Sequence, residues 1–180
     1  IPFQSPTRLA RQAIIGRVRA VFNDQARGEK PVIRSPNSMF GPATVIWRVH
    51  GDVITMMVGG IAALLLQMLH PAVLGGVWDH SDFREDMLGR LRRTARFISM
   101  ATFGPAEDAE AAIARVRSVH AKVSGHLPNG TAYAASDPKL LAWVHVTEAI
   151  SFLDSWIRYG NADVSAADQD RYFVDMARIA

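Results

Sequence analysis

The sequence predicts an all-α fold: one domain over residues 1–180, built as a bundle of roughly seven helices with a buried central apolar helix. Three observations support this prediction. Apolar residues recur at helical spacing through most of the chain. No run alternates cleanly between apolar and polar residues, and the turn dipeptide Asn129-Gly130 falls in a loop. No charged residue lies between Asp52 and Asp79, so a helix in that stretch suits a core.

The first helix is predicted to begin at Ser5-Pro6, where a capping residue precedes a first-turn proline, and to continue to Arg27-Gly28. Residues 29–42 contain several prolines together with serines and glycine, and they predict a flexible loop. A short helix is expected over residues 43–49.

The most apolar helix is predicted over residues 53–69, and His70-Pro71 is expected to end it. The apolar stretch is at the lower limit of the roughly 20 residues that span a bilayer, and no basic flank follows it. A buried core helix is therefore favoured over a membrane span. A position at a membrane interface is the remaining alternative.

An arginine-rich helix is expected over residues 82–97. Asp79 or Ser81 can supply its cap, and Glu85 and Asp86 in its first turn complement the positive end of the helix dipole.

The second half of the chain predicts three more helices. Gly104-Pro105 precedes a helix with acidic residues near its start, and residues 127–136 predict a loop. Asp137-Pro138 is a cap and first-turn signal for a helix that reaches Tyr159-Gly160. Ser165 begins a last helix, which is expected to continue to the end of the chain.

Composition narrows the functional classes. The chain has no cysteine, so disulfides and thiolate metal sites are excluded. The net charge is +3, and no cluster of lysine and arginine is interleaved with aromatic residues, so no nucleic-acid partner is expected. The first residues have no secretory-signal pattern, and a cytoplasmic location is expected. Composition leaves the oligomeric state open.

His120 is the histidine best placed to bind a metal. It shares the apolar face of its predicted helix with Ile113, Val116 and Val123. A neutral imidazole that points inward from a rigid helix is what a haem iron needs from an axial ligand. A core histidine bonded to a carbonyl is the alternative, and spacing alone favours it.

The other histidines carry weaker signals. His145 and Glu148 share one stripe and could bind a metal together, although a structural pair is favoured. His70 is interpreted as a helix terminator with a buried ring. His80 lies in a cap region, and two histidines are assigned to loops or helix ends, namely His50 and His126.

The predicted arginine-rich helix contains a second candidate ligand-binding side chain, Arg90. Arg90 and Thr94 share a face with apolar residues, so Arg90 is expected to point inward, where a guanidinium must be paired. A ligand carboxylate such as a haem propionate would pair with it. The alternative is that Arg90 pairs with Asp86 or with a carboxylate on another helix, while the remaining arginines are solvated, namely Arg92, Arg93 and Arg96. Spacing alone favours this alternative.

Three segments together carry a family resemblance, and individually each is weak. They are WRVHGDVITMMVGGIAALLLQMLHPAVLGGVWDHSDFREDMLGRLRRTARF, VRSVHAKVSG and YAASDPKLLAWVHVTEAISFLD. In combination they resemble the catalytic domain of the oxygenase MpaB and latex-clearing-protein (rubber oxygenase) family, from about Ser5 to the end of the chain. The resemblance implies an all-helical fold that binds haem b, and in some members an oxygenase that cleaves carbon–carbon double bonds with dioxygen. It also implies a family domain that continues past residue 180, so that this chain is truncated at its C-terminal end.

The resemblance assigns roles to single residues. The Arg-x-x-Lys-Thr motif of the latex-clearing branch falls on Arg90, Arg93 and Thr94, which become the catalytic candidates, and the proximal iron ligand falls on His120. Arg93 replaces the lysine that can occupy the distal position, and a guanidinium does not ligate iron. The distal site is therefore expected to be open, water-filled or guarded by an arginine hydrogen bond. The candidate cofactor-binding residues are His120, Arg90, His70 and His145.

The resemblance thus implies a haem b-dependent oxygenase that acts on a hydrophobic small molecule with dioxygen. A non-catalytic module that binds haem or a hydrophobic ligand is the alternative. A structural helical protein with a solvated arginine helix ranks third.

Overall fold

Eight helices and one small hairpin make up the part of the chain that the computed structural model describes, residues 6–22, 28, 30–160 and 163–180. Helix accounts for 68% of the structure, which confirms the all-α prediction. The elements, in chain order, are α1 (Pro6–Phe22), α2 (Val45–Gly51), α3 (Val53–Gln67), α4 (Pro71–His80), α5 (Met87–Phe103), α6 (Ala106–His120), β1 (Ser124–His126), β2 (Ala132–Ala134), α7 (Pro138–Tyr159) and α8 (Ala166–Ala177).

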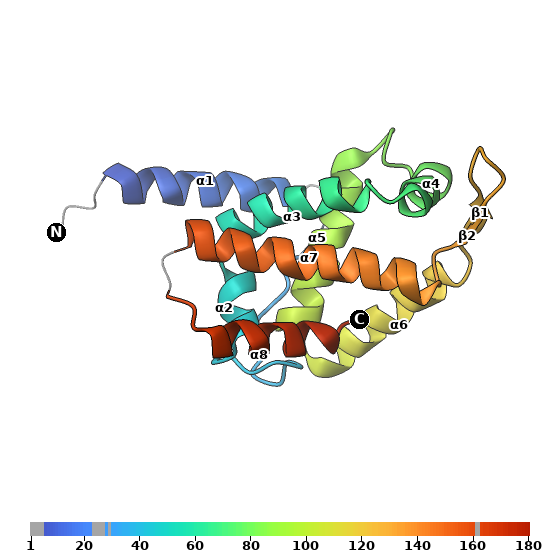
Figure 1. Cartoon of the computed structure of the whole chain (residues 1–180). Helices are drawn as coiled ribbons and strands as arrows, with labels where there is room; N and C mark the ends of the chain where they lie inside the picture. Colours follow the sequence, from blue (N-terminus) through green and yellow to red (C-terminus); the bar gives the residue numbers. More distant parts are fainter. Residues whose placement is uncertain (1–5, 23–27, 29, 161–162) are drawn as a thin grey trace.

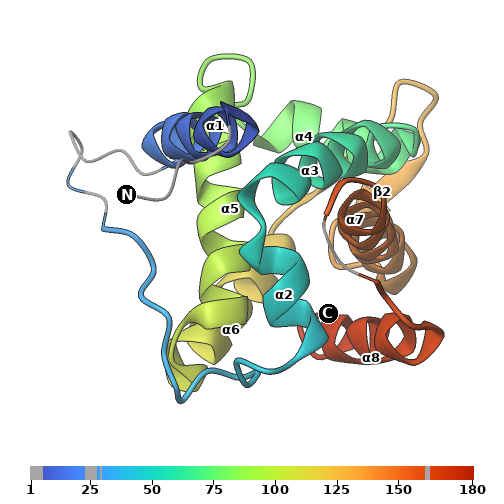
Figure 2. The ribbon, with the colours of Figure 1, turned by 90° about the vertical axis from the view of Figure 1, so that its left-hand side faces the viewer.

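Helices α3 and α7 form the most extensive contact of the fold and lie side by side in Figures 1 and 2. Gly59 permits this approach, because a Cβ there would lie 2.8 Å from the Ser151 carbonyl oxygen and 2.9 Å from Phe152 Cα. The contact surface of α3 is a stripe of small and polar residues, Thr55, Gly59, Ala63 and Gln67. The predicted burial of this apolar helix therefore holds for one face only, and that face is its least apolar.

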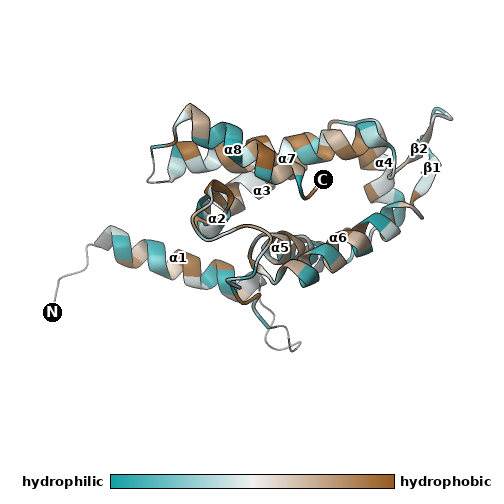
Figure 3. Ribbon diagram, turned by 90° about the horizontal axis from the view of Figure 1, so that it is seen from below, coloured by the Kyte–Doolittle hydropathy of each residue, from teal (hydrophilic) through white to brown (hydrophobic). Residues whose placement is uncertain are grey.

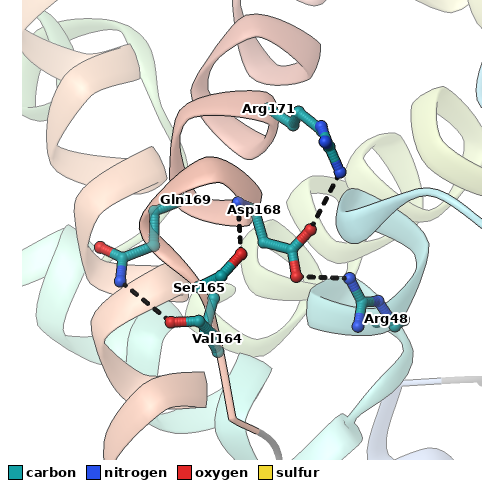
Figure 4. Close-up of polar contacts among 6 residues, drawn as sticks. All are labelled: Arg48, Val164, Ser165, Asp168, Gln169 and Arg171. Atoms are coloured by element: carbon teal, nitrogen blue, oxygen red, sulfur yellow. Dashed lines mark hydrogen bonds and ion pairs between the residues drawn. The ribbon is translucent and has the colours of Figure 1, made fainter.

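The main apolar core lies where α2, α7 and α8 meet. It includes Ile46, Val49, Phe152, Trp156 and Tyr172, together with Phe40 from the preceding loop. Figure 4 shows how polar contacts fix α8 beside α2: Ser165 Oγ accepts a hydrogen bond from Asp168 N, and Asp168 pairs with Arg48 at 3.2 Å. The loop is tied to the far end of α5, since Ser35 N donates to the Phe103 carbonyl at 2.8 Å.

The arginine helix begins later than predicted. Residues 82–86 form a turn in which the Asp82 carbonyl accepts from Glu85 N and Asp86 N. Asp86 then caps α5 by accepting from Gly89 N, so neither Asp79 nor Ser81 is the cap. The helix also continues past residue 97 to Phe103.

Three further predictions need correction. His70 caps the start of α4, which residues 71–80 form, instead of ending α3 with a buried ring. Asn129-Gly130 lies at the tip of the β1–β2 hairpin, where Gly130 has φ +85°. The last helix ends at Ala177. The first helix ends at Phe22, and its predicted extension over residues 23–27 lies outside the described residues.

Single helices within the described ranges are too short or too polar to cross a membrane. The bent pair α2 and α3, which meet at 88°, is sufficiently long and apolar when the two helices are taken together.

Candidate functional site

The catalytic candidates lie on the first half of α5. Arg90 is half-buried, and its carbonyl accepts a hydrogen bond from the Thr94 hydroxyl at 3.2 Å. Burial lowers the pKa of Arg90, the nearby Arg93 lowers it further, and Asp82 raises it. The Asp82 carboxylate also forms an ion pair with Arg93 at 2.7 Å, so Arg90 shares this acidic partner. Arg90 is therefore a partly desolvated cation that suits an anionic ligand group.

Arg93 forms ion pairs with two carboxylates at the start of α5. Its guanidinium contacts Asp82 at 2.7 Å and Asp86 at 3.7 Å, and its side chain is 58% exposed. These ion pairs fasten α5 to the turn before it. Arg96 donates to the Lys30 carbonyl and is also exposed. The alternative that Arg90 pairs with Asp86 finds no support in the described contacts, where Asp86 caps the helix and contacts Arg93.

His120 is the last residue of α6, the helix that packs against α5. Its side chain is half-buried, and burial lowers its pKa, so the ring is neutral at physiological pH. On the same face Ile113 is buried and Val116 is partly buried. The His120 ring makes no hydrogen bond to any residue that the structure describes, whereas His145 donates to a carbonyl. A neutral imidazole without a partner has a lone pair available for a metal.

His70 and His145 lie on different sides of α7. The His70 ring is 5.9 Å from the ring of Trp143, which is on the exposed face of that helix. His145 Nε2 lies 2.8 Å from the Met176 carbonyl of α8, and burial lowers the pKa of His145. The structure therefore does not bring these two histidines together, and the carbonyl bond makes His145 a packed structural residue.

A buried polar cluster was missed in the sequence. His50 lies in the last turn of α2, as its predicted place at a helix end requires, and it is only 6% exposed. Its Nδ1 lies 2.7 Å from Thr102 Oγ1, and its Nε2 lies 3.1 Å from the hydroxyl of Tyr172, which is fully buried. Burial lowers the pKa of His50 to about 3, so the ring stays neutral. The sequence does contain a signal for the burial of His50, because Ile46, Val49 and His50 have the spacing of one buried helical face.

Glu148 lies between this cluster and α3. Burial of its carboxyl group raises the pKa of Glu148 to about 7, although a hydrogen bond with Gln67 opposes that rise. The Glu148 charge in turn raises the pKa of Tyr172. Because Glu148 is bonded to Gln67 and His145 to a carbonyl, the two side chains are engaged with different partners. No group of three or more histidine, aspartate or glutamate residues in the described ranges could hold a metal ion.

Glu148→Gln should make the protein more stable at alkaline pH. The carboxyl pKa is about 7 in the folded protein against 4.5 in an unfolded chain, so the stability that protonated Glu148 contributes is full below pH 4.5 and is lost as the pH rises through 7. The difference corresponds to about 3 kcal/mol of unfolding free energy. Urea unfolding at pH 5 and pH 8.5 measures it, and Asp154→Asn on the exposed face controls for the loss of one charge. An equal effect of Glu148→Gln at both pH values would contradict the assignment.

One open groove of about 410 Å³ lies elsewhere, between α6 and α8. It is lined by Met39, Glu110, Ile113, Ala114, Arg117 and Arg178, and it contains none of the predicted site residues.

His120 ends α6 and Arg90 lies near the start of α5, two helices that pack together, and each side chain has the chemistry of a group that can hold haem b. The imidazole supplies a nitrogen ligand, and the guanidinium supplies a fork of donors for a propionate. Among the described residues, no hydrogen bond or ring contact links His70 or His145 to His120 or Arg90.

Comparison with known proteins places this geometry in context. The sequence model described as "ER-bound oxygenase mpaB/B'/Rubber oxygenase, catalytic domain" matches residues 47–180, well over half of the chain. No curated protein and no solved structure matches the chain. The matched range begins in α2 and includes both α5 and His120.

Proposed function

The chain belongs to the ER-bound oxygenase mpaB/B'/rubber oxygenase catalytic-domain family, and from that premise we propose that it is a haem b-dependent oxygenase that acts on a hydrophobic small molecule with dioxygen. The observation that carries the proposal is His120, a half-buried neutral imidazole without a hydrogen-bond partner among the described residues. It ends the helix that packs against α5.

Each residue has a separate task in this proposal. His120 would hold the iron, and Arg90 would pair with a propionate, which compensates for the desolvation of its guanidinium. Haem, when bound, supplies the centre at which dioxygen is activated. The Thr94 hydroxyl donates a hydrogen bond to the Arg90 carbonyl, so its oxygen is left to accept a hydrogen bond from a ligand group.

Arg93 is proposed to act as a hydrogen-bond donor at the edge of the site, since it cannot ligate iron. Its ion pairs with Asp82 and Asp86 fix the guanidinium beside the first turn of α5. The same ion pairs favour the second candidate function, a non-catalytic module that binds haem or a hydrophobic ligand, because they leave fewer donors for a reacting group.

Two measurements test the proposal. Titration of the apoprotein with hemin should produce a Soret band with a stoichiometry of one haem per chain. The haem-loaded protein should then consume dioxygen in the presence of an unsaturated hydrocarbon substrate. Absence of a Soret band would contradict the proposal, because the protein would then not bind haem.

Arg93→Gln should separate the two candidate functions. We expect the haem spectrum to be retained and kcat/KM for dioxygen-dependent turnover to fall at least about tenfold, because a preorganised donor is lost. Arg96→Gln, on the same helix and also exposed, is the matched control. Unchanged turnover in Arg93→Gln would exclude the donor role, and haem binding without any turnover of the wild type would favour the binding module.

A further inference from the structure

We propose that the outer face of α7 binds the same face of a second copy of this chain, with the two helices antiparallel. This outer α7 stripe is a row of apolar side chains with a charged residue at each end: Lys139, Trp143, Val146, Ile150 and Asp154. The three apolar side chains are between 37% and 51% exposed, and both charged residues are exposed as well. Brown segments recur along α7 in Figure 3. Soluble proteins rarely leave a contiguous apolar patch without a partner.

The fold itself does not use the outer α7 stripe. Its successive members are three or four residues apart, so they line one side of the helix. The residues that the fold buries lie on the other sides of α7 and include Thr147, Ser151, Phe152 and Trp156. Figures 2 and 3 show α7 on the opposite side of the molecule from α5, the helix that carries Arg90. The stripe is therefore separate from the proposed haem site.

The order of residues makes the outer α7 stripe complementary to itself. Lys139 and Asp154 lie about two helical turns on either side of Val146, and Trp143 and Ile150 lie about one turn on either side of it. A two-fold axis near Val146 would place Lys139 of each copy opposite Asp154 of the other. The same axis would place Trp143 opposite Ile150 and Val146 beside its own counterpart. Contacts between identical surfaces have this reciprocal form. A parallel pair would instead bring like charges together.

The charged ends of the stripe are available for a partner. Neither Lys139 nor Asp154 forms a side-chain hydrogen bond or ion pair with any residue that the structure describes. Unfolding of dilute, monomeric protein therefore remains insensitive to Asp154→Asn. Further out on the same helix, the exposed Asp137 and Arg158 would also meet as opposite charges in the antiparallel pair. An apolar centre with an aromatic anchor and a charged rim is the usual anatomy of a protein interface.

Apolar side chains beyond the two ends enlarge this surface. Ile157, which is 39% exposed, follows Asp154 on the same side of α7. At the other end, the ring of His70 lies 5.9 Å from the ring of Trp143, and the neighbouring Leu69 is 71% exposed. Two helices inclined by about 20° stay in contact over several turns. The second copy can therefore bury more than the five residues of the stripe.

Sedimentation equilibrium of the apoprotein tests the inference and does not depend on haem. We expect the wild type to dimerise at micromolar concentrations. Val146→Asp should weaken the dimer at least about tenfold, because two carboxylates would meet at the two-fold axis. Val174→Asp on α8 is the matched control, since it places the same charge on another exposed helical valine and should leave the dimer intact. Circular dichroism confirms that both variants fold.

Exchange of the two charges tests the antiparallel register. Lys139→Asp and Asp154→Lys should each weaken the dimer at least about fivefold, because each change brings like charges together at both ends of the contact. The double variant should recover most of the wild-type affinity, because opposite charges again face each other. Lys122→Asp, at an exposed position after α6, is the control for the loss of a lysine.

Disulfide cross-linking locates the two-fold axis. The chain has no cysteine, so an introduced cysteine reports on the contact without background. Val146→Cys should cross-link two copies under mild oxidation, because the axis brings position 146 close to its counterpart, whereas Val174→Cys should not.

Four results would overturn the inference. They are a monomeric wild type at micromolar concentrations, equal dimerisation of Val146→Asp and Val174→Asp, failure of the double charge exchange to recover the dimer, and equal cross-linking of Val146→Cys and Val174→Cys. A monomeric wild type that binds phospholipid vesicles, when Val146→Asp does not, would assign the stripe to lipid instead of a second copy.

Discussion

Replacement of His120 with alanine is expected to abolish the Soret band that hemin produces with the wild-type protein. The imidazole is the only nitrogen ligand that the proposed site places on the helix beside α5, and burial lowers its pKa, which favours the neutral ring with a free lone pair. Alanine removes the ligand without a burial defect, because the side chain is only half-buried at the end of α6. Absorption spectra of both proteins, titrated with hemin under the same conditions, measure the effect.

His126→Ala is the matched control for this experiment. His126 is exposed on β1, only six residues further along the chain, so its loss should leave the band unchanged. Addition of free imidazole should restore a band to His120→Ala, since a small ligand can enter the space that the side chain left. A band of full intensity in His120→Ala would assign the iron to another residue and would remove the main support for the oxygenase proposal.

Gly59→Ala should lower the free energy of unfolding by about 2 kcal/mol, although alanine is the better helix former. The new Cβ would lie 2.8 Å from the Ser151 carbonyl oxygen and 2.9 Å from Phe152 Cα, both of which are backbone atoms that cannot rotate away. Helices α3 and α7 would have to separate along the most extensive contact of the fold. Denaturant unfolding followed by circular dichroism measures the loss.

Gly60→Ala provides the comparison at the next position. There the nearest atom to a new Cβ is Phe152 Cε1 at 3.7 Å, an ordinary contact with a side chain. Helix propensity should therefore dominate, and this variant should be stabilised by up to about 1 kcal/mol. Opposite signs for the two variants would confirm that close packing, not helix propensity, determines the need for glycine at position 59. Stabilisation in both would contradict the close approach of α3 and α7.

Elements whose signals are local were predicted well. Helix α7 begins at Pro138 after the Asp137 cap and ends at Tyr159 before Gly160, as its terminal residues predict. Ser165 caps α8 by the same mechanism. A side-chain cap and a first-turn proline act within a few residues of the backbone that they stabilise, so neighbouring sequence is sufficient to identify them.

Elements that depend on distant contacts were predicted less well. The β1–β2 hairpin has strands of only three residues, and Tyr133 holds it against α4 through a 2.7 Å hydrogen bond to Asp79. The start of α5 was misplaced because several acidic and hydroxyl residues precede it, and the chain turns at residues 82–86 before Asp86 becomes the cap. Local sequence offers these alternatives, and packing selects one of them.

The sequence by itself determined the helical class, most helix positions, the family and the residues of the motif on α5 and α6. Helical periodicity, caps and motif residues are properties of short segments, so they can be read without the fold. The tertiary structure decided which faces are buried: it placed His50 inside a polar cluster, separated His70 from His145, and turned the large apolar residues of α3 outward. Burial depends on which helices pack together, and the approach of α3 and α7 at Gly59 is a contact between segments far apart in the chain.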